Sequence, residues 1–141
     1  MNPSVNLERF LGAQQTAYEE ALAQIRQGRK TGHWMWFVFP QLRGLGQSTT
    51  AWYYGIENLE EVGSYLAHPV LGQRLREITG VLLTLPTNDP EEIFGWTDSM
   101  KLRSSMTLFY LASGEDVFTQ VLQKYYGGIQ DPLTLQLLTK R

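Results

Sequence analysis

Cationic side chains, a histidine and two tryptophans share one short segment, residues 28–46, with the sequence GRKTGHWMWFVFPQLRGLG. Arginine and lysine carry positive charge, and an imidazole such as that of His33 can donate a hydrogen bond to a phosphate or carry a proton. Flat indole faces can stack on a base or a similar ring. The segment therefore predicts a site for an anionic, ring-bearing metabolite. Its ligand-binding candidates are Arg29, Lys30, Trp34, Trp36, Gln41 and Arg43, and His33 is a candidate catalytic residue.

A second polar cluster, DSMKLRSSMT, begins at Asp98. On a helix, Asp98, Lys101 and Ser105 lie three and four residues apart and share one face. Hydroxyl groups beside a lysine suit phosphate or ribose binding, so Ser104 and Ser105 are ligand-binding candidates next to Lys101. Asp98 and Lys101 are candidate catalytic residues. Because the lysine precedes the serines and no Gly-x-Ser-x-Gly segment occurs, the cluster does not match a serine-nucleophile motif.

Each cluster also has a structural interpretation, which the sequence leaves open. Cations that follow a helix C-terminus gain about 0.3–1 kcal/mol from the helix dipole, and large aromatic side chains commonly fill a core. Asp98 can cap a helix and pair with Lys101, which contributes about 0.2–0.5 kcal/mol. His33 is equally consistent with a half-buried structural residue. His68, which precedes Pro69, is interpreted as a structural residue at a helix start.

The overall charge argues against a nucleic-acid partner. Twelve Lys and Arg residues stand against fourteen Asp and Glu residues, for a net charge of -2, whereas proteins that neutralise phosphate backbones carry a basic excess. The absence of cysteine excludes disulfides, thiolate nucleophiles and cysteine-bound zinc. With only two histidines, far apart in the chain, no metal ligand is assigned. A carboxylate site for magnesium stays open, and the cofactor is unknown.

The termini and the hydropathy bear on location. No stretch approaches the roughly 18 consecutive apolar residues that a membrane span needs, and the start, MNPSVNLERF, lacks the basic and apolar regions of a signal peptide. We therefore expect no membrane contact and a cytoplasmic location. The oligomeric state is not predicted.

The spacing of apolar residues predicts a helical protein. In residues 7–27 they recur every three or four positions between a capping residue, Asn6, and a terminating glycine, Gly28. With 141 residues, 43% of them hydrophobic, the chain is predicted to form one domain, residues 1–141, an all-α irregular orthogonal bundle of about seven short helices. The other predicted helices are Ser48 to Tyr54, Asn58 to about Ala67, Pro69 through Leu82, one after Asp89-Pro90, one from after Asp98 to Gly114, Asp116 to Tyr126, and one after Asp131-Pro132.

The apolar run Trp34–Phe39 is the ambiguous element. Its residues have high β-propensity, and periodicity alone does not separate a strand from a buried helical turn. No second convincing strand is present to accept its hydrogen bonds, so a short buried helix that ends at Pro40 is favoured. Residues 41–47 are then predicted to form a loop.

Three segments, GRKTGHWMWFVFPQLRGLGQS, YLAHPVLGQRL and IFGWTDSMKLRSSMTLF, resemble the bacterial domain-of-unknown-function 1810 family. The resemblance extends from Leu7 to about Leu138 and implies a mainly helical single domain with no established reaction. A more distant likeness, in helical layout and in the segment LAHPVLGQRL, points toward the NADAR fold of proteins that process NAD-derived or ADP-ribose-type metabolites. The motifs of that fold do not occur in the same order here.

Three functions of different class remain, of which nucleic-acid binding through Arg26, Arg29, Lys30 and Arg43 is disfavoured by the net charge. The first is a pocket that binds an anionic, nucleotide-like or phosphate-bearing small molecule between the two polar clusters, with hydrolytic chemistry and enzyme status left open. The second is a non-enzymatic protein-interaction module with an exposed aromatic patch, made by Trp52, Tyr53 and Tyr54 or by the 34–39 run. Burial of Trp34 and Trp36 around a concavity would favour the small-molecule pocket.

Overall fold

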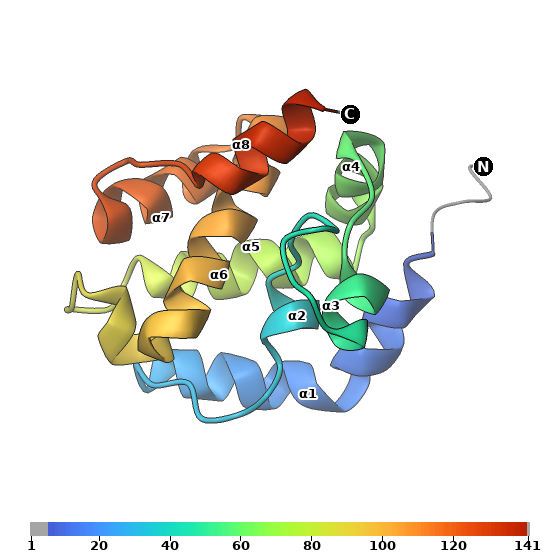
Figure 1. The fold of residues 1–141 in the computed structure, drawn as a ribbon. Helices are drawn as coiled ribbons and strands as arrows, with labels where there is room; N and C mark the ends of the chain where they lie inside the picture. The colour runs from blue at the N-terminus through green and yellow to red at the C-terminus, as the bar shows by residue number, and fades with distance from the viewer. Residues whose placement is uncertain (1–5, 141) are drawn as a thin grey trace.

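The computed structural model describes residues 6–140, and these residues form eight helices and no strand (Figure 1). The prediction of an all-α fold is confirmed. One isolated parallel bridge joins Leu42 to Ile56. The helices are α1 (Glu8–Arg26), α2 (Met35–Val38), α3 (Thr49–Tyr54), α4 (Leu59–Ala67), α5 (Leu71–Leu82), α6 (Pro90–Ser113), α7 (Asp116–Tyr126) and α8 (Pro132–Thr139).

Helix α6 is the centre of the bundle and packs against α4, α7 and α8, while α1 packs against α2 and α5 (Figure 1). A row of aromatic rings passes through the core from α1 to α7. The centroids of Phe10 and Tyr65 lie 5.1 Å apart, those of Tyr65 and Phe109 5.4 Å, and those of Phe109 and Phe118 5.7 Å. Because edge-to-face and tilted ring pairs at such distances are favourable, this row joins helices α1, α4, α6 and α7.

Most helix starts follow the predicted caps. Asn58 accepts a hydrogen bond from the Glu61 amide, Asp131 from Thr134, and Ser48 from Ala51. These contacts satisfy amide groups that have no partner within the helix, which is why short polar residues mark helix starts in a sequence.

Three predicted helix starts need correction. Asn6 is not the cap of α1, because the capping position is Leu7, which offers no side-chain oxygen. Helix α5 begins at Leu71, two residues after Pro69, and His68 caps it by accepting from the amides of Val70 and Leu71 through Nδ1. The prediction of a second helix near Asp98 holds in that Gly95 breaks α6, but the second helical segment begins before Asp98, which is therefore not its cap.

The break inside α6 explains the third correction. Gly95 has φ 76° and ψ 169°, a conformation that non-glycine residues rarely adopt, and it separates a first turn from the long segment that follows. Asp98 therefore lies in the first turn after the break.

The apolar run 34–39 contains the four-residue helix α2, as predicted for a short buried helix. Trp34, immediately before it, is 2% exposed, and its indole N–H donates to Gln24 Oε1 at 2.9 Å. The same oxygen accepts from the amides of Thr31 and Gly32. One glutamine of α1 thus orders the loop that enters α2.

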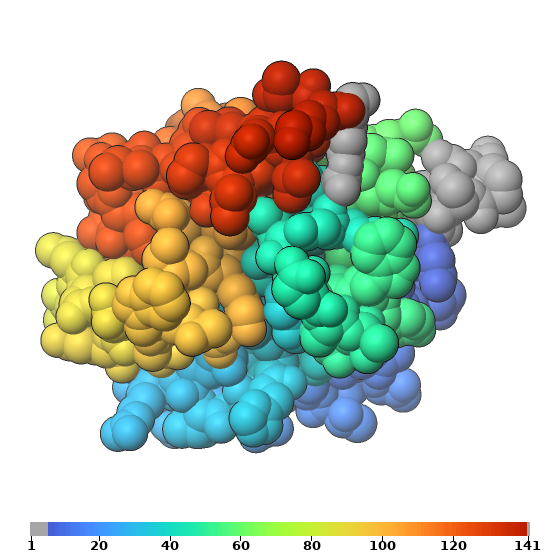
Figure 2. All heavy atoms as spheres, viewed as in Figure 1, coloured from blue at the N-terminus to red at the C-terminus, as the bar shows by residue number. Residues whose placement is uncertain are grey.

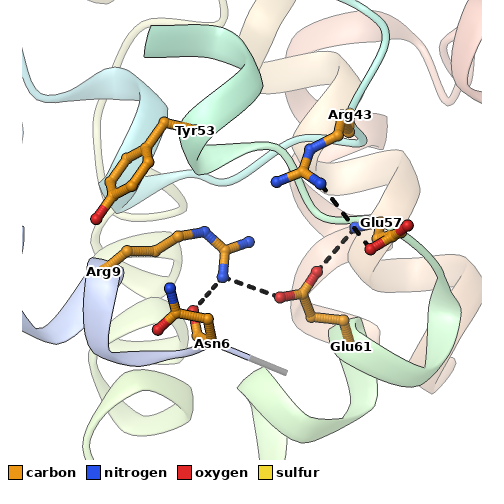
Figure 3. A pocket seen from close by; sticks show the side chains of 6 residues that line it. All are labelled: Asn6, Arg9, Arg43, Tyr53, Glu57 and Glu61. Atoms are coloured by element: carbon orange, nitrogen blue, oxygen red, sulfur yellow. Dashed lines mark hydrogen bonds and ion pairs between the residues drawn. The ribbon is translucent and has the colours of Figure 1, made fainter. Parts of the chain in front are cut away.

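A buried ion pair joins α1 to α4. Arg9 Nη1 lies 3.0 Å from Glu61 Oε2, and both side chains are buried. Figure 3 shows the two groups facing each other, and Glu61 also accepts from the Glu57 amide at 2.8 Å. Arg9 Nη2 donates to the carbonyl of Gly55. Arg9 and Glu61 are remote in the chain, so no local pattern in the sequence indicates this pair.

Within residues 6–140, no helix combines the length and the hydropathy that crossing a bilayer requires.

Two glycines of α5 provide a matched test of the packing between α4 and α5. A Cβ on Gly72 would lie 2.1 Å from the carbonyl oxygen of Leu66, whereas one on Gly80 would meet nothing within 4 Å. We expect Gly72→Ala to lower the free energy of unfolding by about 1–3 kcal/mol through steric overlap. Gly80→Ala should raise it by about 0.5–1 kcal/mol because alanine is the better helix former. Urea denaturation of both variants measures these free energies of unfolding. Equal changes in the two variants would show that α4 and α5 are not closely packed at Gly72.

Candidate functional site

A pocket of about 300 Å³ opens where α2, the loop after it, α6 and the start of α8 meet. In Figure 2 these parts of the chain, coloured teal, orange and red, come together on the face turned to the viewer. The size is at the lower end of the range for small-molecule sites. The lining residues are Trp36, Gln41, Leu45, Gly46, Trp96, Thr97, Met100, Lys101, Ser104, Asp131 and Leu133.

Two tryptophans from different elements line the pocket. Trp36 comes from α2, and the Nζ atom of Lys101 lies 4.6 Å from the centroid of its ring. Trp96 comes from the first turn after the α6 break and is 65% exposed. Gly46 allows the close approach of Trp36, because a Cβ there would lie 2.7 Å from Cη2 of the indole. The pocket therefore combines two indole surfaces with one ammonium group.

Behind Lys101, Asp98 is shared by two lysines. Its Oδ2 lies 2.6 Å from Lys30 Nζ, and its Oδ1 lies 3.1 Å from Lys101 Nζ. Lys30 Nζ also donates to the carbonyl of Gly32 and lies 5.1 Å from the centroid of the Trp34 ring. The side chains of Lys30, Asp98 and Lys101 are 7%, 17% and 24% exposed. The structure thus brings together charged residues from both clusters that the sequence singled out.

The electrostatic balance keeps Asp98 ionised. Burial acts to raise the pKa of its carboxyl group, but the hydrogen bonds and positive charges of Lys30 and Lys101 together outweigh burial, so the pKa lies below its ordinary value. Two cations share one anion, which leaves an excess of one positive charge in the group. A carboxylate held in this way is a weak proton acceptor at neutral pH.

Gln41 forms part of the pocket wall and is only 3% exposed. Its backbone is held by the bridge to the segment before α4: the Gln41 carbonyl accepts from Ile56 at 2.9 Å, and Arg43 donates to the Ile56 carbonyl at 2.8 Å. Its side-chain Nε2 has no hydrogen-bond partner among residues 6–140.

Two other polar side chains in the wall, Ser104 and Asp131, have partners. Ser104 Oγ donates to the Met100 carbonyl at 3.2 Å. Asp131 Oδ2 accepts from the amide and hydroxyl of Thr134, and Oδ1 lies 3.6 Å from Arg103 Nη2. The sequence predicted Asp131 as a helix cap. In the structure it caps α8 and also lines the pocket.

Of the eleven candidate residues, four line this pocket and two stand behind it. Those in the wall are Trp36, Gln41, Lys101 and Ser104, and those behind are Lys30 and Asp98. The sequence missed seven lining residues: Leu45, Gly46, Trp96, Thr97, Met100, Asp131 and Leu133. Some carried a local signal, since Trp96 and Thr97 adjoin Asp98 in the segment GWTDSMK, and Met100 adjoins Lys101.

The other five candidates lie elsewhere. His33 is exposed on the loop before α2 and does not line the pocket. Arg29 lines a separate depression beside the start of α6. Arg43 lines a small polar pocket (Figure 3), where it faces Glu57.

Trp34 and Ser105 are the remaining two. Trp34 is a core residue with its N–H already bonded to Gln24, and Ser105 is completely buried. Their positions agree with the structural interpretation of these two residues. No group of three or more His, Asp or Glu residues within 6–140 is placed to hold a metal ion.

The aromatic residues of α3 form a second surface. Trp52 and Tyr53 are 62% and 52% exposed, and the guanidinium of Arg43 lies 4.6 Å from the centroid of the Trp52 ring. Tyr54 turns inward, with its ring centroid 5.3 Å from that of Phe37. The exposed part of the predicted aromatic patch therefore consists of two residues.

Comparison with known proteins identifies one family and one solved structure whose descriptions name no activity. A family model described as "Protein of unknown function (DUF1810)" matches residues 4–138. The crystal structure of the conserved hypothetical protein Rv1873 from Mycobacterium tuberculosis is similar, with a TM-score of 0.94 and 51% sequence identity over 96% of this chain and 97% of that chain. No curated protein matches.

The shared carboxylate predicts a pH-dependent stability. Because the pKa of Asp98 is lower in the folded state, its stabilisation is complete above the unfolded value of about 3.9 and is lost as the pH falls through the folded value. We expect Asp98→Asn to lower the free energy of unfolding by about 2–3 kcal/mol at neutral pH, with a smaller difference from the wild type below about pH 4.

Urea denaturation of both proteins between neutral and acid pH measures the difference. Asp89→Asn is the matched control, because Asp89 caps α6 and asparagine is an equally good cap. A difference for Asp98→Asn that stays constant down to acid pH would contradict the assignment.

Proposed function

The chain belongs to the DUF1810 family, whose description names no activity, and from its own geometry we propose that it binds a small anionic molecule that carries a flat ring. The proposal depends on one observation, the convergence of two indole surfaces and a charged lysine on a single pocket. The family membership predicted from the three sequence segments is confirmed by the match over residues 4–138.

The charge distribution supports an anionic ligand. Lys101 shares Asp98 with Lys30, so an incoming phosphate or carboxylate can approach Lys101 while Asp98 keeps the second lysine as its partner. A charge-assisted hydrogen bond of this kind contributes about 1.5–3 kcal/mol. Lys30 is thus a positioning residue, because its charge allows Lys101 to turn toward a ligand without leaving a buried carboxylate alone.

The two tryptophans support a ring on the ligand. Stacking of a base on an aromatic side chain is worth about 1–3 kcal/mol, and it tolerates different rings because every base has a flat face. Trp96 lines the pocket and is largely exposed, which leaves its surface available for such a contact.

Binding is favoured over hydrolysis. In the pocket wall the ionisable side chains are Lys101 and Asp131, and both already have partners of opposite charge. Asp98 is held ionised by two lysines, and His33 lies outside the wall. We therefore assign no general acid or base.

A protein-interaction surface on α3 is the second candidate, and the exposure of the neighbours Trp52 and Tyr53 favours it. It ranks second because only two rings are exposed there.

Titration with partial ligands tests the proposal. We expect ribonucleoside monophosphates to raise the melting temperature more than free nucleosides, which lack the anion, or ribose phosphate, which lacks the ring. A ligand at one hundred times its Kd stabilises the folded state by about 2.7 kcal/mol. Lys101→Met should weaken binding at least about tenfold, which is about 1.4 kcal/mol.

Two controls make this result specific. Lys124→Met removes the same charge from a lysine that also lies over an aromatic ring, 5.3 Å from the centroid of Tyr125, but outside the pocket, and it should leave affinity unchanged. Replacement of Trp52 and Tyr53 by serine should also leave the affinity for the nucleotide unchanged. If millimolar ring-bearing anions leave the melting temperature of the wild type unchanged, the proposal is wrong.

A further inference from the structure

The two tryptophans of the pocket wall differ in what already contacts them. Trp36 is half-buried, and the Nζ atom of Lys101 lies 4.6 Å from the centroid of its ring. The benzene edge of its indole packs against Gly46, where a Cβ would lie 2.7 Å from Cη2. Trp96, by contrast, is 65% exposed. A ligand ring therefore meets an open indole surface on Trp96, whereas an ammonium group already lies over the ring of Trp36.

The surroundings of Trp36 repeat those of a core tryptophan. Trp34, two residues earlier, also has a lysine over its ring, with Lys30 Nζ 5.1 Å from the centroid, and it is only 2% exposed. Both lysines bind the same carboxylate, that of Asp98. A cation over an indole face is favourable, more so when it is partly removed from water. Trp36 is therefore suited to hold the side chain of Lys101 in the pocket wall.

Trp96 shares a helix face with the ammonium group. The residues of α6 that line the pocket are one, three or four positions apart from each to the next, as expected for one face of a helix. They are Trp96, Thr97, Met100, Lys101 and Ser104. A ligand that lies along this face can place its ring on the exposed indole and its anionic group at the lysine.

We propose that Trp96 is the residue on which the ligand ring stacks, and that Trp36 is a positioning residue, which holds Lys101 for the anionic group. The inference rests on the proposed function, and it divides the recognition of ring and anion between the two indoles. Loss of Trp96 then removes the contribution of the ring, while loss of Trp36 weakens only the contact with the anion.

Calorimetry with adenosine monophosphate and ribose 5-phosphate isolates the ring, because both ligands carry the same sugar phosphate. The ring ratio is the affinity for the first divided by the affinity for the second. In Trp96→Ala this ratio should fall at least about fivefold, in keeping with the strength of stacking between a base and an aromatic side chain. In Trp36→Leu both affinities should fall by the same factor, at least about threefold, and the ring ratio should stay unchanged.

A double-mutant cycle with Lys101→Met tests the positioning role. Trp36→Leu should cause little further loss in the Lys101→Met background, since its effect passes through the lysine. Trp96→Ala should add to Lys101→Met within about twofold, because it removes a separate contact. Trp36→Phe keeps an aromatic face for the ammonium group, so it should bind adenosine monophosphate at least about threefold more tightly than Trp36→Leu, but only where Lys101 is present.

Trp52 offers a matched control for an exposed tryptophan. It is 62% exposed and has the guanidinium of Arg43 4.6 Å from the centroid of its ring, but it does not line the pocket. Trp52→Ala should leave both affinities, and therefore the ring ratio, unchanged.

The outcomes separate the inference from the proposed function. If Trp36→Leu lowers the ring ratio as far as Trp96→Ala does, or if Trp96→Ala leaves it unchanged, the assignment of the two roles is wrong while the proposed function stands. Full additivity of Trp36→Leu with Lys101→Met also overturns it, because Trp36 then does not act through the lysine. Should Trp36→Leu fail to fold, Trp36→Phe takes its place in the cycle. If the wild type does not bind adenosine monophosphate at millimolar concentration, the proposed function and the inference both fail.

Discussion

Asp98 accepts hydrogen bonds from the ammonium groups of Lys30 and Lys101, and this shared carboxylate joins the loop after α1 to the long segment of α6. Each lysine also lies over one tryptophan, Lys30 over Trp34 and Lys101 over Trp36. The ion group therefore contacts the first and third residues of the 34–39 run. One indole is a core residue and the other is a pocket wall, although the two are separated by a single residue.

The same group sets the chemistry of the pocket. Two cations on one carboxylate leave one positive charge in excess, next to a surface that is otherwise largely aromatic and apolar. Charges that are only partly exposed interact more strongly than surface charges, because water screens them less. This combination suits a flat ring with an acidic substituent and does not require a proton donor or acceptor.

Much of the fold could be predicted from the sequence because helices are local structures. The spacing of apolar residues located the helices, and Asn58, Asp131 and Gly127 marked helix ends that the structure contains. The errors lie where a local signal was ambiguous. Gly95 breaks α6 through a positive φ, so Asp98 follows a break and does not cap a helix start. His68 took over the cap of α5 beside Pro69.

The sequence by itself determined the helical class, the family and the residue types able to bind an anionic ring, since each depends on patterns within one segment. Only the tertiary structure decided which of those residues meet. The contacts of Lys30 with Asp98, Trp36 with Lys101 and Gln41 with Ile56 each join segments that are remote in the chain. Such contacts have no periodic signature, because they arise when loops close around a packed core. That is why His33 and Arg29 lie apart from the pocket, while Trp96 and Asp131 line it.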